Sequence, residues 1–113
     1  MNNQQNDSEE RLTVSNALEA LAAEDKPFKS LFTHGSMEVE IYKPEKVDNQ
    51  TPHTRDELYV IASGSGEFIN GEKQHVVEVG EVLFVAAGVE HRFVNFTDDF
   101  STWVFFYGPE GGE

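Results

Sequence analysis

Cysteine is absent from the 113 residues of the chain. Its absence excludes a disulfide framework, a thiolate zinc site and a cysteine nucleophile, and it fits a reducing compartment. The N-terminal sequence MNNQQNDSEERLT contains neither a basic segment nor an apolar one, so it does not resemble a signal peptide. We therefore expect a cytoplasmic protein.

Basic residues and long apolar runs are also scarce. Eight Lys and Arg residues oppose 21 Asp and Glu residues, which gives a formal net charge of −13. Such a surface repels phosphate backbones and anionic lipid headgroups, so we expect neither nucleic acid nor membrane partners. No apolar run approaches the ~20 residues that cross a bilayer. The acidic charge is typical of a well-solvated surface and identifies no substrate.

The length of the chain predicts one domain. Residues 1–11 carry almost no apolar side chains and are expected to form a disordered tail. The domain itself is expected over residues 12–108, with a flexible, glycine-rich tail over residues 109–113. Apolar residues recur at helical spacing between about Thr13 and Glu24, which predicts one N-terminal helix.

From Ser36 onward the apolar period changes to two, which is typical of β-strands. About seven short strands, separated by turns that contain glycine, predict an all-β antiparallel sandwich or barrel. The pattern leaves a jelly roll, an immunoglobulin-like sandwich and a lipocalin-like barrel open. The expected strands are Ser36–Ile41, Leu58–Ala62, Glu67–Ile69, Gln74–Val79, Val82–Val85, Glu90–Phe96 and Thr102–Tyr107. The aromatic residues Phe84, Phe93, Trp103, Phe105 and Tyr107 are expected to line the core.

Polar residues occupy alternate positions before and within one of these strands. His53 and Glu57 are four residues apart, so an extended chain places both on the same face. Arg55 lies between them on that face, and Thr51 and Tyr59 extend the row.

A second histidine, His91, opens a later strand and shares its face with Phe93. Two imidazoles and a carboxylate that converge inside a barrel need a partner, because burying them bare is costly. A divalent cation would satisfy His53, Glu57 and His91 together.

The first of two spaced motifs surrounds the first histidine. The cupin superfamily carries the pattern G-x5-H-x-H-x3-E-x6-G, and this stretch resembles it at His53, Glu57 and Gly64. Thr51 replaces the first histidine of that pattern, and no glycine lies six residues ahead of it.

The second motif resembles the superfamily pattern G-x5-P-x-G-x2-H-x3-N. Gly80, Gly88, His91 and Asn95 match its spacing, with Ala86 in place of proline. The resemblance covers about residues 36–107 and identifies the chain as a small single-domain cupin.

The resemblance implies a small antiparallel jelly-roll β-barrel (a double-stranded β-helix) with the one helix outside it. Typical members hold iron, manganese, nickel, copper or zinc on three histidines and one glutamate. Here the implied set is His53, Glu57 and His91, which leaves open positions on an octahedral ion. Thr51 is expected to add a weak oxygen ligand or to orient a water molecule.

Two neighbours of these residues are candidate substrate-binding residues. Arg55 is expected either to bind a substrate carboxylate or to pair with Asp56 or Glu90. Tyr59 is expected either to donate to a bound ligand or to form part of the barrel wall.

The leading hypothesis for function is a metal-dependent enzyme, of dioxygenase or isomerase type, that acts on a small organic molecule and holds Fe, Mn, Ni or Zn. The alternatives are a non-catalytic module that binds a small molecule or a metal, and a metal-free structural or sugar-binding barrel. We also expect a homodimer formed through edge strands, with Ser36–Ile41 and the last strand as candidates.

Overall fold

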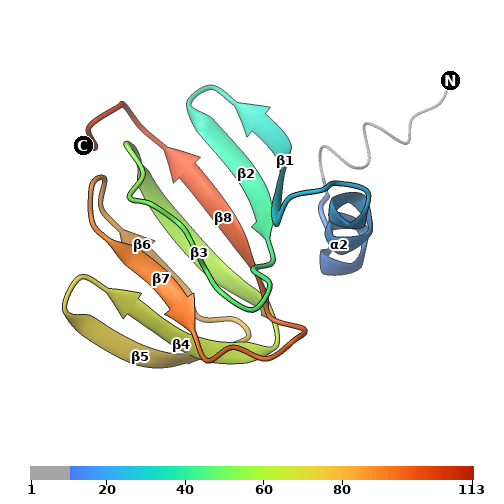
Figure 1. Ribbon diagram of the computed structural model, residues 1–113. Coiled ribbons are helices and arrows are strands. Elements are labelled where there is room, and N and C mark those ends of the chain that lie inside the picture. The colour runs from blue at the N-terminus through green and yellow to red at the C-terminus, as the bar shows by residue number, and fades with distance from the viewer. Residues whose placement is uncertain (1–10) are drawn as a thin grey trace, which may run out of the picture.

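The computed structural model describes residues 11–113, in which two antiparallel β-sheets face one another and one helix lies outside them (Figure 1). The tail expected over residues 1–11 lies outside the described residues, apart from Arg11. The expected jelly-roll architecture is confirmed. The domain boundaries at residues 12 and 108 stay predictions.

The larger sheet has five strands and the smaller has three, and all neighbouring strands are antiparallel. In spatial order, the larger sheet consists of β1 (Phe28–His34), β2 (Met37–Tyr42), β8 (Ser101–Tyr107), β3 (Asp56–Ser63) and β6 (Val82–Val85). The smaller sheet consists of β5 (Lys73–Glu78), β4 (Ser65–Asn70) and β7 (His91–Val94). Because β2 and β8 both lie inside the larger sheet, their expected role as pairing edges is wrong, and β1 and β6 form its edges.

The strand β1 was not predicted from the sequence. The register between β1 and β2 shifts between Ser30 and Phe32, as a β-bulge does. A bulge breaks the alternation of apolar and polar residues, so the period-two signal is lost there.

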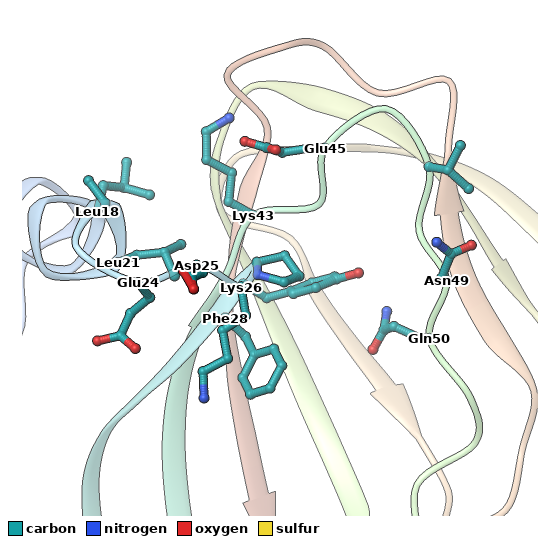
Figure 2. A pocket seen from close by; sticks show the side chains of 14 residues that line it. Leu18, Leu21, Glu24, Asp25, Lys26, Phe28, Lys43, Glu45, Asn49 and Gln50 are labelled. Atoms are coloured by element: carbon teal, nitrogen blue, oxygen red, sulfur yellow. The ribbon is translucent and has the colours of Figure 1, made fainter.

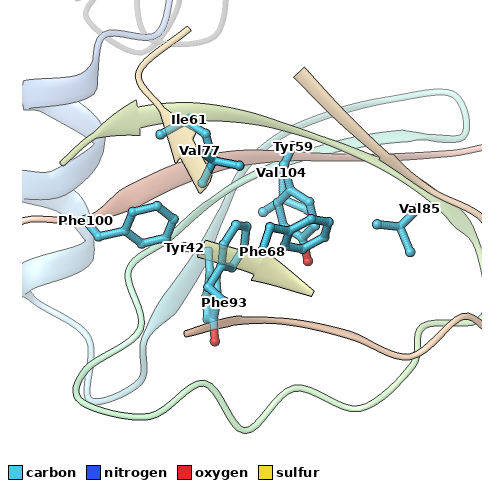
Figure 3. Close-up of a cluster of buried hydrophobic side chains, with 9 residues drawn as sticks. All are labelled: Tyr42, Tyr59, Ile61, Phe68, Val77, Val85, Phe93, Phe100 and Val104. Atoms are coloured by element: carbon cyan, nitrogen blue, oxygen red, sulfur yellow. The ribbon is translucent and has the colours of Figure 1, made fainter. Parts of the chain in front are cut away.

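The space between the two sheets is filled mainly by aromatic rings (Figure 3). Phe93 lies with its ring centre 4.7 Å from that of Phe68 and 4.8 Å from that of Phe100. The Tyr59 ring meets Phe93 edge to face at 5.1 Å. Two of these rings, Tyr59 and Phe68, also lie against the ring of His91. The buried cluster comprises Tyr42, Tyr59, Ile61, Phe68, Val77, Val85, Phe93, Phe100 and Val104.

The helix α2 (Val14–Ala22) covers part of the outer face of the larger sheet. The side chain of Thr13 caps it by accepting a hydrogen bond from the Asn16 backbone N–H at 3.2 Å. Ala17 and Leu21 of the helix pack on Ile41 of β2. The apolar side of β2 therefore faces outward, under the helix.

The opposite side of β2 faces the interior and carries Glu38, Glu40 and Tyr42. The alternation expected for this strand is confirmed, but its polar face lines the barrel. The sequence alone gives two faces and does not tell which one a helix covers.

Several aromatic residues expected in the core lie on the outer face instead. Only Phe93 is fully buried, whereas Phe84 is 51% exposed. Trp103 and Phe105 are half-buried and pair in register with Val60 and Leu58, on the face away from the metal centre described below. The expectation of core lining is therefore wrong for Phe84, whereas Trp103 packs on the second buried cluster, formed by the helix and Ile41.

Gly64 ends β3 with a positive φ of 71°. A Cβ atom at this position would lie 2.7 Å from the Cα atom of Phe100, which is closer than real contacts allow. This explains in physical terms why a glycine stands at this place of the first motif.

The C-terminal residues return to the start of β3. Gly111 N donates a hydrogen bond to Thr54 O at 2.6 Å, and Glu113 N donates to the Asp56 carboxylate at 3.0 Å. This bond and a second one from Ala87 N lower the pKa of Asp56. Mobility of residues 109–113 stays a prediction.

Candidate metal centre

Three side chains from two facing parts of the barrel converge at one point. His53 lies in the segment before β3, Glu57 lies on β3, and His91 opens β7 in the opposite sheet. One donor atom from each lies within 4.8 Å of the other two. The structure thus brings together the three residues that the sequence spacing selected.

The separations suit a single ion. Oε2 of Glu57 lies 2.7 Å from Nδ1 of His53 and 3.4 Å from Nε2 of His91. Ligand atoms that each lie about 2.1 Å from one ion are about 3 to 4 Å apart.

The donor atoms are buried and lack other partners. The Glu57 residue is 0% exposed and His91 is 4% exposed. Apart from one another, Nδ1 of His53, Nε2 of His91 and both carboxylate oxygens of Glu57 have no hydrogen-bond partner within the described chain. Burying such atoms bare is unfavourable, so the site fits a cation that all three would ligate.

A backbone carbonyl orients the second histidine. Nδ1 of His91 lies 2.8 Å from Val89 O, and a hydrogen bond there leaves Nε2 unprotonated and directed at Glu57. Metal-binding histidines commonly hold their other ring nitrogen in this way. The sequence offered no signal for this contact.

The electrostatics of the site depend on Glu57. Its carboxylate raises the pKa of His53, although burial of the ring acts in the opposite direction. A neutral imidazole is the form that binds a metal, so a cation and a proton compete for this ring. Metal binding is therefore expected to release protons near neutral pH.

Tyr59 belongs to the aromatic wall beside the centre. Its ring centre is 5.9 Å from that of His91, and its hydroxyl donates to Oε1 of Gln50 at 3.0 Å. Burial raises the pKa of Tyr59 well above its ordinary value, so the phenol stays neutral.

The other two candidate residues lie farther out. Arg55 lines the cavity beside the centre, where an Nη2 hydrogen bond to Ser36 O holds it and its guanidinium carbon lies 5.9 Å from the Phe106 ring centre. No ion pair joins Arg55 to Asp56 or Glu90 within residues 11–113. Thr51 is exposed and lies outside the three-residue cluster.

A cavity of about 390 Å³ opens beside His53. Cavities of this size accept small organic molecules. Its wall carries three carboxylates that the sequence analysis did not place inside, Glu38, Glu40 and Glu110. The residues that border it include Glu38, Glu40, His53, Arg55, Val104 and Phe106.

Glu40 is one of the carboxylates in this wall. Burial, with the neighbouring charges of Glu38 and Glu57, raises its pKa from 4.5 to about 7, while His53 and Lys26 act in the opposite direction. A carboxyl group with this pKa both accepts and donates protons near neutrality.

The segment between β2 and β3 is fixed by the buried carboxylate of Asp48. It accepts hydrogen bonds from the Tyr42 hydroxyl, from the backbone and side-chain amides of Gln50, and from Phe93 N of the opposite sheet. Burial and the hydrogen bond to Asp48 raise the pKa of Tyr42. Because Gln50 also accepts from Tyr59, the segment is connected to the wall of the metal centre.

A second, wider hollow of about 840 Å³ lies between α2 and this segment (Figure 2). Leu18 and Leu21 border it on the helix side, and Asn49 and Gln50 border it on the other side. Phe28, Tyr42 and Gln50 border both hollows, so the two hollows adjoin. Their boundary is the part of the wall that Asp48 fixes.

Comparison with known proteins agrees with this architecture. The family model of the cupin domain matches residues 38–107. The chain belongs to the cupin family. The resemblance described from the sequence is therefore confirmed.

Three similar proteins illustrate the family. An uncharacterized protein of Streptomyces coelicolor, SCO3923, is 33% identical over 91 residues, which are 79% of this chain and 87% of that protein. A cupin 2 conserved barrel domain protein from Salinispora arenicola superposes with a TM-score of 0.61 at 18% identity, over 72% of this chain and 74% of that one. The DMSP lyase DddQ from Ruegeria pomeroyi superposes with a TM-score of 0.62 at 21% identity.

The likeness to DddQ concerns the fold alone. It covers 72% of this chain but 46% of DddQ, so the chain spans about half the length of that enzyme. Separately, no helix within residues 11–113 is long and apolar enough to cross a membrane.

Proposed function

We propose that this cupin is a metal-dependent enzyme, of dioxygenase or isomerase type, that acts on a small organic molecule. His53, Glu57 and His91 would hold one Fe, Mn, Ni or Zn ion. The observation that carries the proposal is the set of buried donor atoms without partners, placed beside a cavity of about 390 Å³. A site built only for stability would not leave these atoms unsatisfied.

The residues of the chain would orient the substrate and exclude water from the metal centre. When bound, the ion would polarise a carbonyl group or bind oxygen at its open positions. Val89 O fixes the His91 ring, and Tyr59 and Phe68 form an apolar wall against that ring. Arg55 would bind an anionic group of the substrate at the cavity wall through its Nε, which has no partner within the described residues.

Thr51 and Tyr59 stay proposals as substrate-binding residues. The Tyr59 hydroxyl would reach a ligand only by giving up its hydrogen bond to Gln50. Thr51 would act from the exposed end of the segment.

A non-catalytic module that binds a small molecule or a metal is the second candidate. The engagement of both Tyr59 and Arg55 with other protein groups favours it, because few polar groups are then free to act on a ligand. The metal centre would be the same in both cases.

Metal analysis tests the proposed centre. The purified protein is dialysed with Fe(II), Mn(II), Ni(II) or Zn(II) under argon, and its metal content is measured by mass spectrometry. We expect about one ion per wild-type chain and a loss in the His91→Ala and Glu57→Gln variants. His75→Ala is the matched control, because His75 is exposed on β5. Equal metal content in all four proteins would reject the centre.

Turnover distinguishes the two candidates once the metal is known. Oxygen uptake is followed with a panel of diketones, thiols and catechols, and isomerisation is followed by proton NMR. Turnover by the wild type that is lost in His91→Ala supports an enzyme. Binding of panel members without turnover supports the module.

A second copy of this chain is the proposed partner, which makes the protein a homodimer. The outer sheet face is apolar and carries no charged side chain among the residues that border its hollow. On a chain of net charge −13, a second copy of the same apolar face is the surface that covers it without opposing charge. The outer sheet face comprises Phe32, Met37, Val39, Val60, Trp103 and Phe105.

Light scattering with Trp103→Glu tests the dimer. We expect the wild type at twice the mass of one chain and the variant at the mass of one chain, with circular dichroism confirming that the variant is folded. A folded monomeric wild type would reject the dimer. The cytoplasmic location, and the absence of nucleic acid and membrane partners, stay predictions.

A further inference from the structure

Glu40 shares the inner face of the larger sheet with the metal centre. In the strand register, Glu40 of β2 pairs with Val104 of β8, and Val104 pairs with Tyr59 of β3. The neighbouring row contains Phe106, which pairs with Glu57. Glu40 therefore lies two strands across from Glu57, in the row of residues next to the one that contains Glu57.

The width of β8 separates the two carboxylates. Neighbouring strands lie about 4.8 Å apart, so the backbones of β2 and β3 are about 10 Å apart. Both Glu40 and His53 border the same cavity of about 390 Å³. A small molecule bound at the metal centre would lie between the centre and Glu40.

Glu40 also differs from the structural carboxylates in having no partner. No hydrogen bond or ion pair within residues 11–113 holds it. Asp48, in contrast, accepts four hydrogen bonds. Glu40 is thus free to exchange a proton with a ligand.

The charged groups around Glu40 come from every element that borders it. Glu38 lies on the same strand, and Glu57 and His53 lie across the cavity. Lys26 precedes β1, and Arg55 and Glu110 border the same cavity. The resulting pKa of about 7 suits a group that accepts and returns protons.

We propose that Glu40 is a catalytic residue that removes a proton from a carbonyl-bearing substrate held at the metal centre. The substrate class is a small carbonyl compound with a hydrogen on the carbon next to the carbonyl. This inference rests on the proposed function, and it favours isomerisation over oxygen chemistry.

The step balances without an oxidant or a reductant. The C–H bond breaks, the proton bonds to a carboxylate oxygen of Glu40, and the electron pair stays on the substrate and spreads onto the carbonyl oxygen. When the carbon that loses the proton also carries a hydroxyl group, the hydroxyl proton passes to the carbonyl oxygen and the proton on Glu40 returns to the former carbonyl carbon, which completes an isomerisation and restores the Glu40 carboxylate. The ion would stabilise the charge on the oxygen.

Acetohydroxamic acid is a suitable probe, because it binds metals as an anion and so must give up a proton. The protein is loaded with Zn(II), which undergoes no redox chemistry. Calorimetric titrations in buffers of different ionisation enthalpy then give the number of protons released per probe bound. We compare the wild type with Glu40→Gln and, as control, with Glu78→Gln, which lies exposed on β5.

The wild type and Glu78→Gln are expected to keep the proton on Glu40 and to release few protons. Glu40→Gln is expected to release about one proton per probe and to bind it about tenfold more weakly, because a charge-assisted hydrogen bond is lost. A merely structural role of Glu40 would not change the proton count.

The outcomes separate this inference from the proposed function. Equal proton release by the wild type and Glu40→Gln overturns the role of Glu40 and leaves the metal centre intact. Zinc-loaded wild type that binds no probe also overturns it, because the cavity then does not present a ligand to Glu40. Failure to retain zinc overturns the proposed function itself.

Discussion

Two clusters of buried polar groups border the same interior and differ in how their atoms are satisfied. The carboxylate of Asp48 accepts four hydrogen bonds, whereas among the described residues that of Glu57 lies against His53 and His91 alone. A buried carboxylate whose hydrogen-bonding capacity is satisfied stabilises the fold, whereas one whose capacity is unsatisfied is available to a ligand. The difference separates an acid fixed by the fold from the acid that we propose as a metal ligand.

Loss of the Asp48 hydrogen bonds is expected to lower the free energy of unfolding more than any of the following changes. Asp48→Ala leaves the Tyr42 hydroxyl, the Phe93 N–H and the Gln50 amides without their acceptor. We expect a decrease of about 4 kcal/mol in the free energy of unfolding, measured by urea titration.

Asp48→Asn is the matched control for this prediction. It keeps the shape of the side chain and one acceptor oxygen, so the expected loss is about 2 kcal/mol. A loss below ~1 kcal/mol in Asp48→Ala would show that the hydrogen bonds of this cluster do not hold the segment in place.

The cluster of His53, Glu57 and His91 is expected to be stabilised by a bound metal ion. A metal that binds the folded chain at 100 times its dissociation constant raises the free energy of unfolding by about 2.7 kcal/mol. Thermal unfolding of the metal-free and metal-loaded protein measures this gain. In His91→Ala the gain should disappear, because one of the three donors is missing.

The metal-free forms sharpen the same comparison. Metal-free His91→Ala is expected to lose less stability than Asp48→Ala, since it removes the hydrogen bond to Val89 O whereas Asp48→Ala removes the acceptor of four. A larger loss in His91→Ala would contradict the division into structural and chemical clusters.

The smallest effect concerns Glu40 and pH in the metal-free protein. The folded chain holds the Glu40 proton up to about pH 7, whereas the ordinary pKa is 4.5. Between these values the folded state binds more protons than the unfolded state, so the free energy of unfolding falls as the pH rises. The destabilisation is absent below pH 4.5 and complete above pH 7.

Glu40→Gln should remove this pH dependence. We expect the variant to be more stable than the wild type by about 1 kcal/mol at pH 8, because the partial exposure of Glu40 screens much of the effect. Near pH 4 the difference should vanish. Urea titrations at the two values measure it, and an equal difference at both would contradict the raised pKa.

Much of the fold and of the metal centre followed from the sequence. The spacing of His53 and Glu57 fixes their common face on an extended chain, and the second motif adds His91 with the turn before it. These are local relations, and local relations are what a single sequence displays. The family match and the convergence of the three side chains agree with them.

The remaining features depend on contacts between distant segments. Strand β1 was missed because its bulge interrupts the alternation. The interior position of Glu38 and Glu40 was missed because only the packing of α2 on Ile41 decides which face of β2 turns outward. Two of the four hydrogen bonds that Asp48 accepts come from strands β2 and β7, so the polar loop sequence could not predict them.

The alternation of inward and outward side chains along β3 determines which mutations this strand tolerates. Glu57 and Tyr59 face the interior, while Leu58 and Val60 face outward toward the apolar sheet surface. Substitutions at one set therefore reach the ligand chemistry, and those at the other reach the outer surface. Insertion of a single residue would turn every following side chain of the strand to the opposite face. The strand therefore tolerates substitutions far better than a change of length.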